Sequence, residues 1–239
     1  MTDSTPTIVL VHGAFAESSS WNGVIRRLAE KGHDVVAIAN PLRSLDGDAA
    51  YLRDVVTAIG KPVVLVGHSY GGMVITEAAA DNAQVVGLVY VAAFVPNHGQ
   101  SALELSGSEP GSTLGDALNA YPVATGGNEF AIRQEVFRHQ FAADVSAADA
   151  ALLAVTQRPV TEAALAAGLA TTNPAWKDTP SWFIFGDADL NIPVAAHRNG
   201  ATLASSRGTT EIAGASHAIG VSQPDAVAAT ILAAVDAIA

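Results

Sequence analysis

Short apolar runs alternate with longer amphipathic stretches along most of the chain. Six runs rich in Val, Ile and Leu are apolar at successive positions, which is typical of strands buried on both faces: residues 7–12, 35–39, 62–67, 85–92, 181–186 and 209–212. Apolar residues recur at helical spacing in residues 20–31, 47–59, 70–82, 193–203 and 224–238. This alternation predicts an α/β fold with a doubly wound, mainly parallel, six-stranded sheet.

The alternation is interrupted once, in residues 96–178. No strand-like run is evident there, and two stretches with helical spacing, 129–141 and 147–156, are separated from their neighbours by turn-forming residues. We expect this segment to form a small, mostly helical cap. It would be inserted into a core made of residues 1–95 and 179–239.

The charge balance and the apolar runs exclude some partners. The chain of 239 residues has 12 basic and 23 acidic residues, a formal charge of −11, and no cluster of Lys and Arg. Because this charge repels phosphate backbones, we expect no nucleic-acid partner. Residues 1–6 lack the features of a secretory signal, and the longest apolar stretches, such as 85–95, fall short of the roughly 20 residues needed to cross a bilayer. We therefore expect a cytoplasmic protein without a membrane partner.

The strongest chemical signal is the sequence Gly-His-Ser-Tyr-Gly-Gly at residues 67–72, between a predicted strand and a predicted helix. In such a G-x-S-x-G turn the serine is held in a strained backbone conformation and exposed, and the glycines relieve crowding. The N-terminus of the following helix favours developing negative charge. The motif predicts Ser69 as a nucleophile and the Tyr70 N–H as one donor of an oxyanion hole.

A second oxyanion donor is expected in the loop that follows the first strand, His-Gly-Ala-Phe at residues 12–15. Gly13 allows the backbone to approach the site closely, and we assign the donor to the Ala14 N–H in preference to the Phe15 N–H. We expect the Phe15 side chain to form a wall of the pocket. His12 is expected to brace the loop by hydrogen bonding.

In a fold with this serine turn, the chain order is the serine, then an Asp or Glu, then the histidine base. His139, His197 and His217 satisfy the order, but the first two lie in helical stretches, where we expect solvated surface positions. His217 lies in a turn-rich loop between the last strand and the final helix, at the same sheet edge as Ser69. It is the predicted base.

The acid that orients the histidine is expected directly after the strand at 181–186. Two carboxylates follow that strand, Asp187 and Asp189. Asp187 is close enough to the strand end to cap the turn, so we predict that Asp189 holds the imidazole tautomer. A buried Asp paired with His stays ionised and favours the imidazolium formed during attack.

Four segments in this order, Val-His-Gly-Ala at 11–14, the serine motif at 67–72, Gly-Asp-Ala-Asp at 186–189 and Gly-Ala-Ser-His at 214–217, resemble the α/β-hydrolase superfamily. The short N-terminus and small cap resemble the compact group that contains plant methyl esterases and hydroxynitrile lyases, and bacterial esterases share this outline. The resemblance implies a triad and two oxyanion donors at the residues already predicted: Ser69, Asp189, His217, Ala14 and Tyr70.

The predicted reaction is hydrolysis of small, mostly apolar carboxylic esters through an acyl-enzyme on Ser69. It needs no metal and no organic cofactor. The chain has no cysteine and hence no thiolate metal site. Apolar residues that flank the catalytic loops are candidates for the substrate pocket, although each also fits a core position: Phe15, Phe94, Val95, Ile192 and Ile219.

Two other functions use the same sequence features. In hydroxynitrile lyases a catalytic lysine follows the triad histidine, whereas Ala218 follows His217 here, so lyase action is disfavoured. Peroxide could replace water at the acyl-enzyme and give a perhydrolase side activity. From another class, a hydrolase-fold receptor or regulatory binding protein would retain the triad with slow turnover. No motif in the cap sets the acyl size, the alcohol size, the stereopreference or the oligomeric state.

Overall fold

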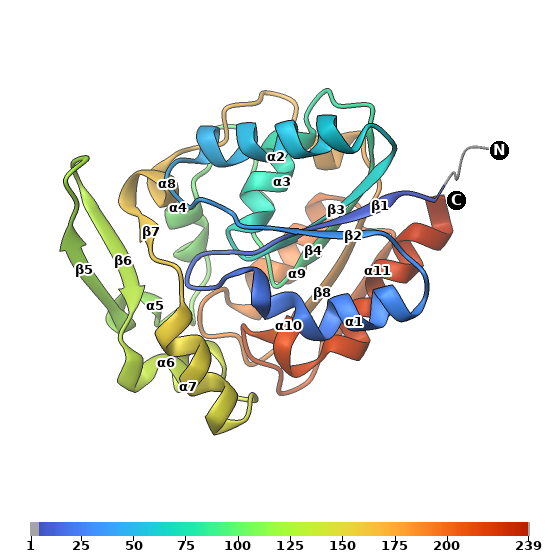
Figure 1. The fold of residues 1–239 in the computed structure, drawn as a ribbon. Helices are drawn as coiled ribbons and strands as arrows, with labels where there is room; N and C mark the ends of the chain where they lie inside the picture. Colours follow the sequence, from blue (N-terminus) through green and yellow to red (C-terminus); the bar gives the residue numbers. More distant parts are fainter. Residues whose placement is uncertain (1–4, 239) are drawn as a thin grey trace.

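The computed structural model describes residues 5–238; residues 1–4, part of the segment expected to lack a secretory signal, and residue 239 lie outside the described residues. Six strands form one sheet in the order β2-β1-β3-β4-β8-β9, with every neighbouring pair parallel (Figure 1). The sheet confirms the predicted fold class. Its strands are β1 (Thr7–Val11), β2 (Val35–Ile38), β3 (Val63–His68), β4 (Val85–Val91), β8 (Ser181–Gly186) and β9 (Gly208–Ile212).

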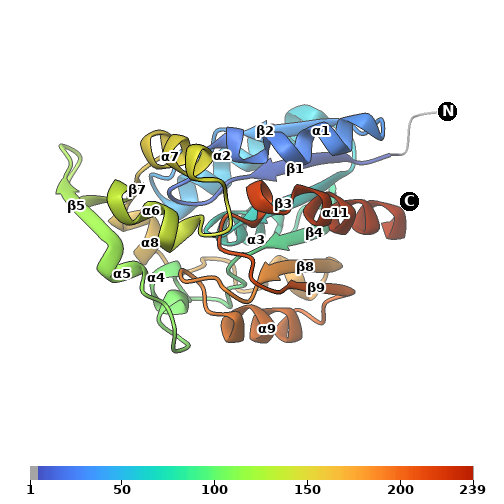
Figure 2. The same cartoon turned by 90° about the horizontal axis from the view of Figure 1, so that it is seen from below.

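Helices cover both faces of the sheet. On one face, α1 (Asn22–Glu30) and α11 (Pro224–Ile238) share a core with Ile8 and Leu10 of β1. On the other, α2 (Leu45–Ile59), α3 (Gly71–Ala79) and α9 (Val194–Leu203) share a core with Val9 and Val11 of the same strand (Figures 1 and 2). Successive strand residues point to opposite faces, so a strand covered on both sides must be apolar at every position.

The segment 96–178 lies over the carboxyl edge of the sheet (Figure 1) and contains five helices. It also contains an antiparallel three-stranded sheet, β5-β6-β7, for which the sequence showed no strand-like run. Its elements are α4 (Ala102–Ser106), α5 (Leu114–Ala117), β5 (Leu118–Pro122), β6 (Asn128–Ile132), α6 (Gln134–Phe141), α7 (Ala147–Thr156), β7 (Val160–Thr161) and α8 (Glu162–Ala166).

Short 3-10 or α-helical turns complete the fold at Ser18–Trp21, Ala175–Lys177 and, as α10, Ile219–Ser222. Within residues 5–238, no helix combines the length and the apolar character that a bilayer span requires.

Hydrogen bonds to main-chain carbonyls attach the 96–178 segment to loops of the core. The Phe15 N–H donates to the Arg158 carbonyl at 3.1 Å, and the Thr161 N–H donates to the Leu42 carbonyl at 3.1 Å. The Thr161 hydroxyl donates to the Arg43 carbonyl at 2.7 Å. The position of this segment over the sheet edge is therefore fixed partly through the loop that follows β1.

Candidate active site

Ser69 occupies the turn between β3 and α3 with a φ of +54°. This left-handed conformation costs a non-glycine residue about 1–2 kcal/mol. Three main-chain bonds hold it: the Ser69 N–H donates to the Val91 carbonyl, and the Ser69 carbonyl accepts from the N–H groups of Gly72 and Phe94. The strain is thus fixed by β4 and by the first turn of α3.

Two glycines permit the close packing around this serine. A Cβ on Gly13 would lie 2.6 Å from the Ser69 Cβ, and a Cβ on Gly72 would lie 2.2 Å from the Phe94 carbonyl oxygen. Both separations are far below a normal contact, so a side chain at either position would displace the serine turn or the adjoining loop.

The two predicted oxyanion donors lie at the same cavity as Ser69. Ala14 and Tyr70 both line it, and neither N–H donates in the turns and loops of residues 5–238. The Phe15 N–H, the alternative donor, is already bonded to the Arg158 carbonyl at 3.1 Å. The structure thus leaves the Ala14 N–H free and engages that of Phe15.

Asp189 and His217 are in direct contact. The Nδ1 atom of His217 lies 2.6 Å from Oδ2 of Asp189, and both side chains are fully buried. An ionised carboxylate can only accept, so Nδ1 carries the proton and donates it. In the neutral ring the Nε2 atom then carries a free lone pair. This is the tautomer that a general base requires.

The Nε2 atom of His217 is buried and has no hydrogen-bond partner among the described residues. No hydrogen bond joins it to Ser69 in this structure. In enzymes without bound substrate such bonds are often long and shorten in the reacting complex. The ring itself is held by Phe141, which meets it edge-on with centroids 4.9 Å apart.

The Asp189 carboxylate is satisfied at both oxygens. Its Oδ1 atom accepts the N–H groups of Asn191 at 2.7 Å and of Ile192 at 3.0 Å. Burial alone would raise the pKa of this carboxyl, but the interaction with His217 and the hydrogen bonds from His197 and His217 outweigh it and hold the pKa well below its usual range. Asp189 is therefore ionised at neutral pH. Asp187 is exposed, and its Oδ1 accepts the Gly214 N–H at 2.6 Å.

The expectation of a solvated His197 was wrong. This side chain in α9 is only 2% exposed, and its Nε2 lies 3.1 Å from Oδ2 of Asp189. A signal for burial was present in the sequence: His197, Gly200 and Ala201 recur at helical spacing and form the buried face of α9. His139 of α6 is exposed, as expected.

The cavity at Ser69 measures about 550 Å³, part of which is open to solvent. Of the predicted pocket residues, Phe15, Phe94 and Ile192 line it. Val95 lies instead in the wall of a neighbouring cavity that shares Phe94 and Ile192. The prediction that Ile219 lines the pocket was wrong, because its side chain is fully buried in the core on the α1 and α11 face of the sheet.

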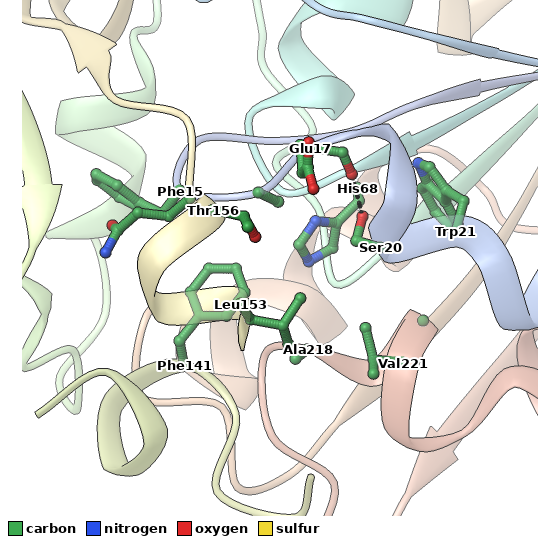
Figure 3. A pocket seen from close by; sticks show the side chains of 13 residues that line it. Phe15, Glu17, Ser20, Trp21, His68, Phe141, Leu153, Thr156, Ala218 and Val221 are labelled. Carbon is green, nitrogen blue, oxygen red and sulfur yellow. Dashed lines mark hydrogen bonds between the residues drawn. The ribbon is translucent and has the colours of Figure 1, made fainter. Parts of the chain in front are cut away.

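Sequence reasoning missed the part of this cavity that comes from the 96–178 segment. These residues are mostly apolar and belong to α4, α5, β5 and α8, where no motif marked them: Ala102, Leu103, Ser106, Leu114, Gly115, Leu118 and Leu165. Phe15 also lines a third cavity, which contains Trp21, His68 and Phe141 (Figure 3). There His68 stands edge-on to Trp21 and Phe141.

Two buried histidines brace the loops of the site. His68 donates from Nε2 to the His217 carbonyl at 3.0 Å, and His12 donates from Nδ1 to the Gly13 carbonyl at 2.9 Å. Burial lowers the pKa of His12 to about 4. Burial, followed by the nearby His217, lowers the pKa of His68 to about 3. Both rings are neutral in the folded protein at pH 7.

These two pKa values predict acid-sensitive stability. In the unfolded chain both histidines titrate near 6.5, so the unfolded state takes up protons first and stability falls as the pH drops from about 6.5 toward 3. Each pKa unit corresponds to about 1.4 kcal/mol, so several kcal/mol should be lost by about pH 4. Urea unfolding at a series of pH values measures this loss. In His68→Gln, which keeps an N–H donor but does not titrate, the loss should be smaller; an unchanged slope would contradict the assignment.

Tyr70 is anchored from behind the site by Asp48. The buried Tyr70 hydroxyl donates to Asp48 Oδ2 at 3.1 Å, and the Arg43 N–H donates to Oδ1 at 3.2 Å. Burial raises the pKa of both the Tyr70 hydroxyl and the Asp48 carboxyl. The contact ties the residue that carries a predicted oxyanion donor to the start of α2.

Removing this anchor should destabilise the protein. Asp48→Ala leaves the buried Tyr70 hydroxyl without an acceptor, which costs about 1–3 kcal/mol of the free energy of unfolding. Chemical denaturation measures the change. In a Tyr70→Phe background the hydroxyl is already gone, so Asp48→Ala should cost less there. Equal costs in the two backgrounds would refute the contact.

Within residues 5–238, no group of three or more His, Asp or Glu side chains is placed to hold a metal ion. Among these residues, the arrangement offers a strained serine and two free N–H groups at one cavity, and an imidazole that is oriented by a carboxylate and packs against His68, the residue before the serine. These are the groups that acyl transfer to a serine requires.

The chain belongs to the alpha/beta hydrolase family, whose sequence model matches residues 8–230. It is 39% identical over 113 residues to a carbendazim hydrolyzing esterase from Nocardioides sp. (strain SG-4G), which covers 41% of this chain and 46% of that protein. The match thus spans about half the length of that relative. The chain is also 26% identical over 242 residues to the putative chloroplastic methylesterase 11 of Arabidopsis thaliana, and this match covers 93% of this chain and 62% of that protein.

Among solved structures, polyneuridine aldehyde esterase superposes with a TM-score of 0.82 and 22% identity, covering 96% of this chain and 98% of that one. At this identity the likeness shows the shared fold. The methylesterase relative confirms the resemblance to the plant methyl esterase group inferred from the motifs.

Proposed function

We propose that this protein is a serine hydrolase that cleaves small, mostly apolar carboxylic esters, with Ser69 as nucleophile, His217 as base and Asp189 as orienting acid. The observation that carries the proposal is the state of His217. Its Nδ1 is held by Asp189 at 2.6 Å, and its Nε2 is buried and has no hydrogen-bond partner among residues 5–238. The strained Ser69 directly follows His68, whose ring packs against that of His217.

The reaction needs two acyl transfers. His217 Nε2 takes the proton of Ser69 while the Ser69 Oγ attacks the ester carbonyl. The resulting oxyanion accepts hydrogen bonds from the N–H groups of Ala14 and Tyr70. His217 then gives the proton to the leaving alcohol, and an acyl-enzyme remains. Water attacks this ester with His217 again as base, the acid leaves, and Ser69 regains its proton. Asp189 stays ionised and stabilises the imidazolium throughout.

The cavity lining supports an apolar substrate. Phe15, Phe94 and Ile192 face it together with four leucines of the 96–178 segment, so its walls favour hydrocarbon over charge. The relatives described above as a carbendazim hydrolyzing esterase, a methylesterase and a polyneuridine aldehyde esterase agree with ester chemistry.

Lyase chemistry of the hydroxynitrile type is not supported. The residue after His217 is Ala218, and none of Lys31, Lys61 and Lys177 lines the Ser69 cavity. No lysine ammonium is therefore placed to meet a departing cyanide at this site.

Labelling with a fluorophosphonate, followed by peptide mass analysis, tests the nucleophile directly. The label should map to the peptide that contains Ser69, and a panel of p-nitrophenyl esters of increasing chain length should show steady-state turnover. Label on another serine would overturn the proposal. A single acylation without steady-state turnover would instead identify a receptor-like protein that retains the triad.

A further inference from the structure

Asp189 is contacted by a second histidine that the proposed reaction does not use. His197 lies in α9, and its Nε2 is 3.1 Å from the same Oδ2 atom that accepts His217 Nδ1 at 2.6 Å. The exposed fractions of the His197 and Asp189 side chains are 2% and 0%. One carboxylate oxygen is therefore shared by two imidazoles in a site closed to solvent.

The chemistry of the groups fixes the direction of both bonds. A carboxylate can only accept, so His197 donates from Nε2 as His217 donates from Nδ1. The N–H groups of Asn191 and Ile192 occupy the other oxygen, Oδ1. Asp189 therefore receives four donors, two on each oxygen. His197 is the only one of the four that belongs neither to the acid loop nor to the base.

The His197 ring cannot easily turn away from this contact. It stacks on Phe185 of β8 with centroids 5.0 Å apart and an angle of 13° between the planes. Its neighbours on the buried face of α9 are Gly200 and Ala201, which let the helix approach the sheet closely. Packing thus holds the ring in the plane from which Nε2 reaches Asp189.

We propose that His197 is a positioning residue for the reaction proposed above: its Nε2–H fixes the orientation of the Asp189 carboxylate and takes part of the hydrogen-bonding capacity of Oδ2 that would otherwise go to His217. The inference rests on the proposed function. It assigns His197 a role in setting both the geometry and the basicity of the acid.

Removal of this donor has two consequences. The Asp189 carboxylate gains freedom to rotate, so the His217 ring is held less firmly. The carboxylate also becomes a stronger acceptor for His217 alone, which stabilises the imidazolium and raises the pH at which the base loses its proton. Other titratable groups near the pair are His68 from β3, Glu211 from β9, and Asp144, which accepts from Ser216 beside His217. All of these groups are retained in the variants at position 197.

Two variants separate the hydrogen bond from the packing. His197→Phe keeps an aromatic ring against Phe185 but has no donor, whereas His197→Gln offers an amide N–H in place of Nε2–H. For His197→Phe we expect kcat to fall about tenfold with KM nearly unchanged, because His197 does not line the Ser69 cavity. The acidic limb of the kcat/KM profile should move to higher pH by about half a unit. His197→Gln should restore both values toward the wild type.

The outcomes decide the proposal. If kcat fell equally in both variants and the acidic limb did not move, His197 would contribute only packing. If His197→Phe kept wild-type kinetics, the hydrogen bond to Asp189 would have no effect on the reaction. Either result overturns the inference. If His197→Phe fails to fold, His197→Asn, whose shorter amide cannot reach Oδ2, replaces it.

A readout independent of turnover separates this inference from the proposed function. The proton of the short His217 Nδ1 bond gives a downfield NMR signal, and its position should change in His197→Phe and return in His197→Gln. If no ester is turned over by the wild type but this signal responds, the proposed function fails and the coupling of His197 to Asp189 stands. An unresponsive signal overturns the coupling whatever the activity.

Discussion

Ser69→Ala is expected to lower kcat for ester hydrolysis by about 10⁶-fold, because no other nucleophile can form the acyl-enzyme. The residual rate would come from the two N–H donors and from substrate binding. Stability should change little, since the main-chain bonds that hold residue 69 to Val91, Gly72 and Phe94 do not involve the hydroxyl. Steady-state kinetics and a thermal melt on the same preparation check both statements.

A matched control is available in the same cavity. Ser106 of α4 also lines it but lies at a helix end with no strained turn, so Ser106→Ala should retain kcat within about twofold of the wild type. If Ser69→Ala kept more than about 1% of the activity, or if Ser106→Ala lost as much, the assignment of the nucleophile would be wrong.

Asp189→Asn is expected to lower kcat by about 10⁴-fold. The amide presents an N–H group where His217 Nδ1 now donates, so the ring must adopt the other tautomer and Nε2 carries a proton when it should accept one. The variant keeps the size of the side chain, and any loss therefore reports on the proton rather than on packing. Comparison of kcat at the pH optimum measures it.

Asp187→Asn is the matching control two residues away. Its side chain is exposed, and an amide oxygen can still accept the Gly214 N–H, so activity should stay within about twofold of the wild type. A large loss in Asp187→Asn with a small one in Asp189→Asn would reverse the roles of the two carboxylates.

The parallel sheet was predictable because burial on both faces removes polar residues from the strands. Val63–His68 and Ser181–Gly186 are buried at every position. The strands of the 96–178 segment lack this property. All five residues of β5 are exposed or half-buried, and β6 begins with Asn128 and Glu129, so neither shows an apolar run. The stretch 129–141 consequently resembled one helix, whereas β6 ends at Ile132 and α6 begins at Gln134.

The residues of the candidate site could be predicted from the sequence where one loop after a strand carries the motif, and not where a helix contributes a side chain from beside the loop. The sequences of the serine motif and of the His217 loop each indicate a turn after a strand. His197 does not, because its contact with Asp189 depends on how α9 packs on Phe185 of β8. Ile219 failed for the opposite reason: it follows the loop closely in sequence, but α10 turns it into the core beside Trp21.

The hydrogen bond from the Phe15 N–H to the Arg158 carbonyl has an evolutionary consequence. It uses only main-chain atoms, as does the bond from Thr161 to Leu42, so it survives replacement of the side chains on either side. Residues such as Leu103, Leu114 and Leu165 can then diversify without moving the loop that carries Ala14. In the proposed hydrolase, part of the cavity wall is therefore encoded separately from the catalytic residues, and new specificities could be selected there without rebuilding the reaction centre.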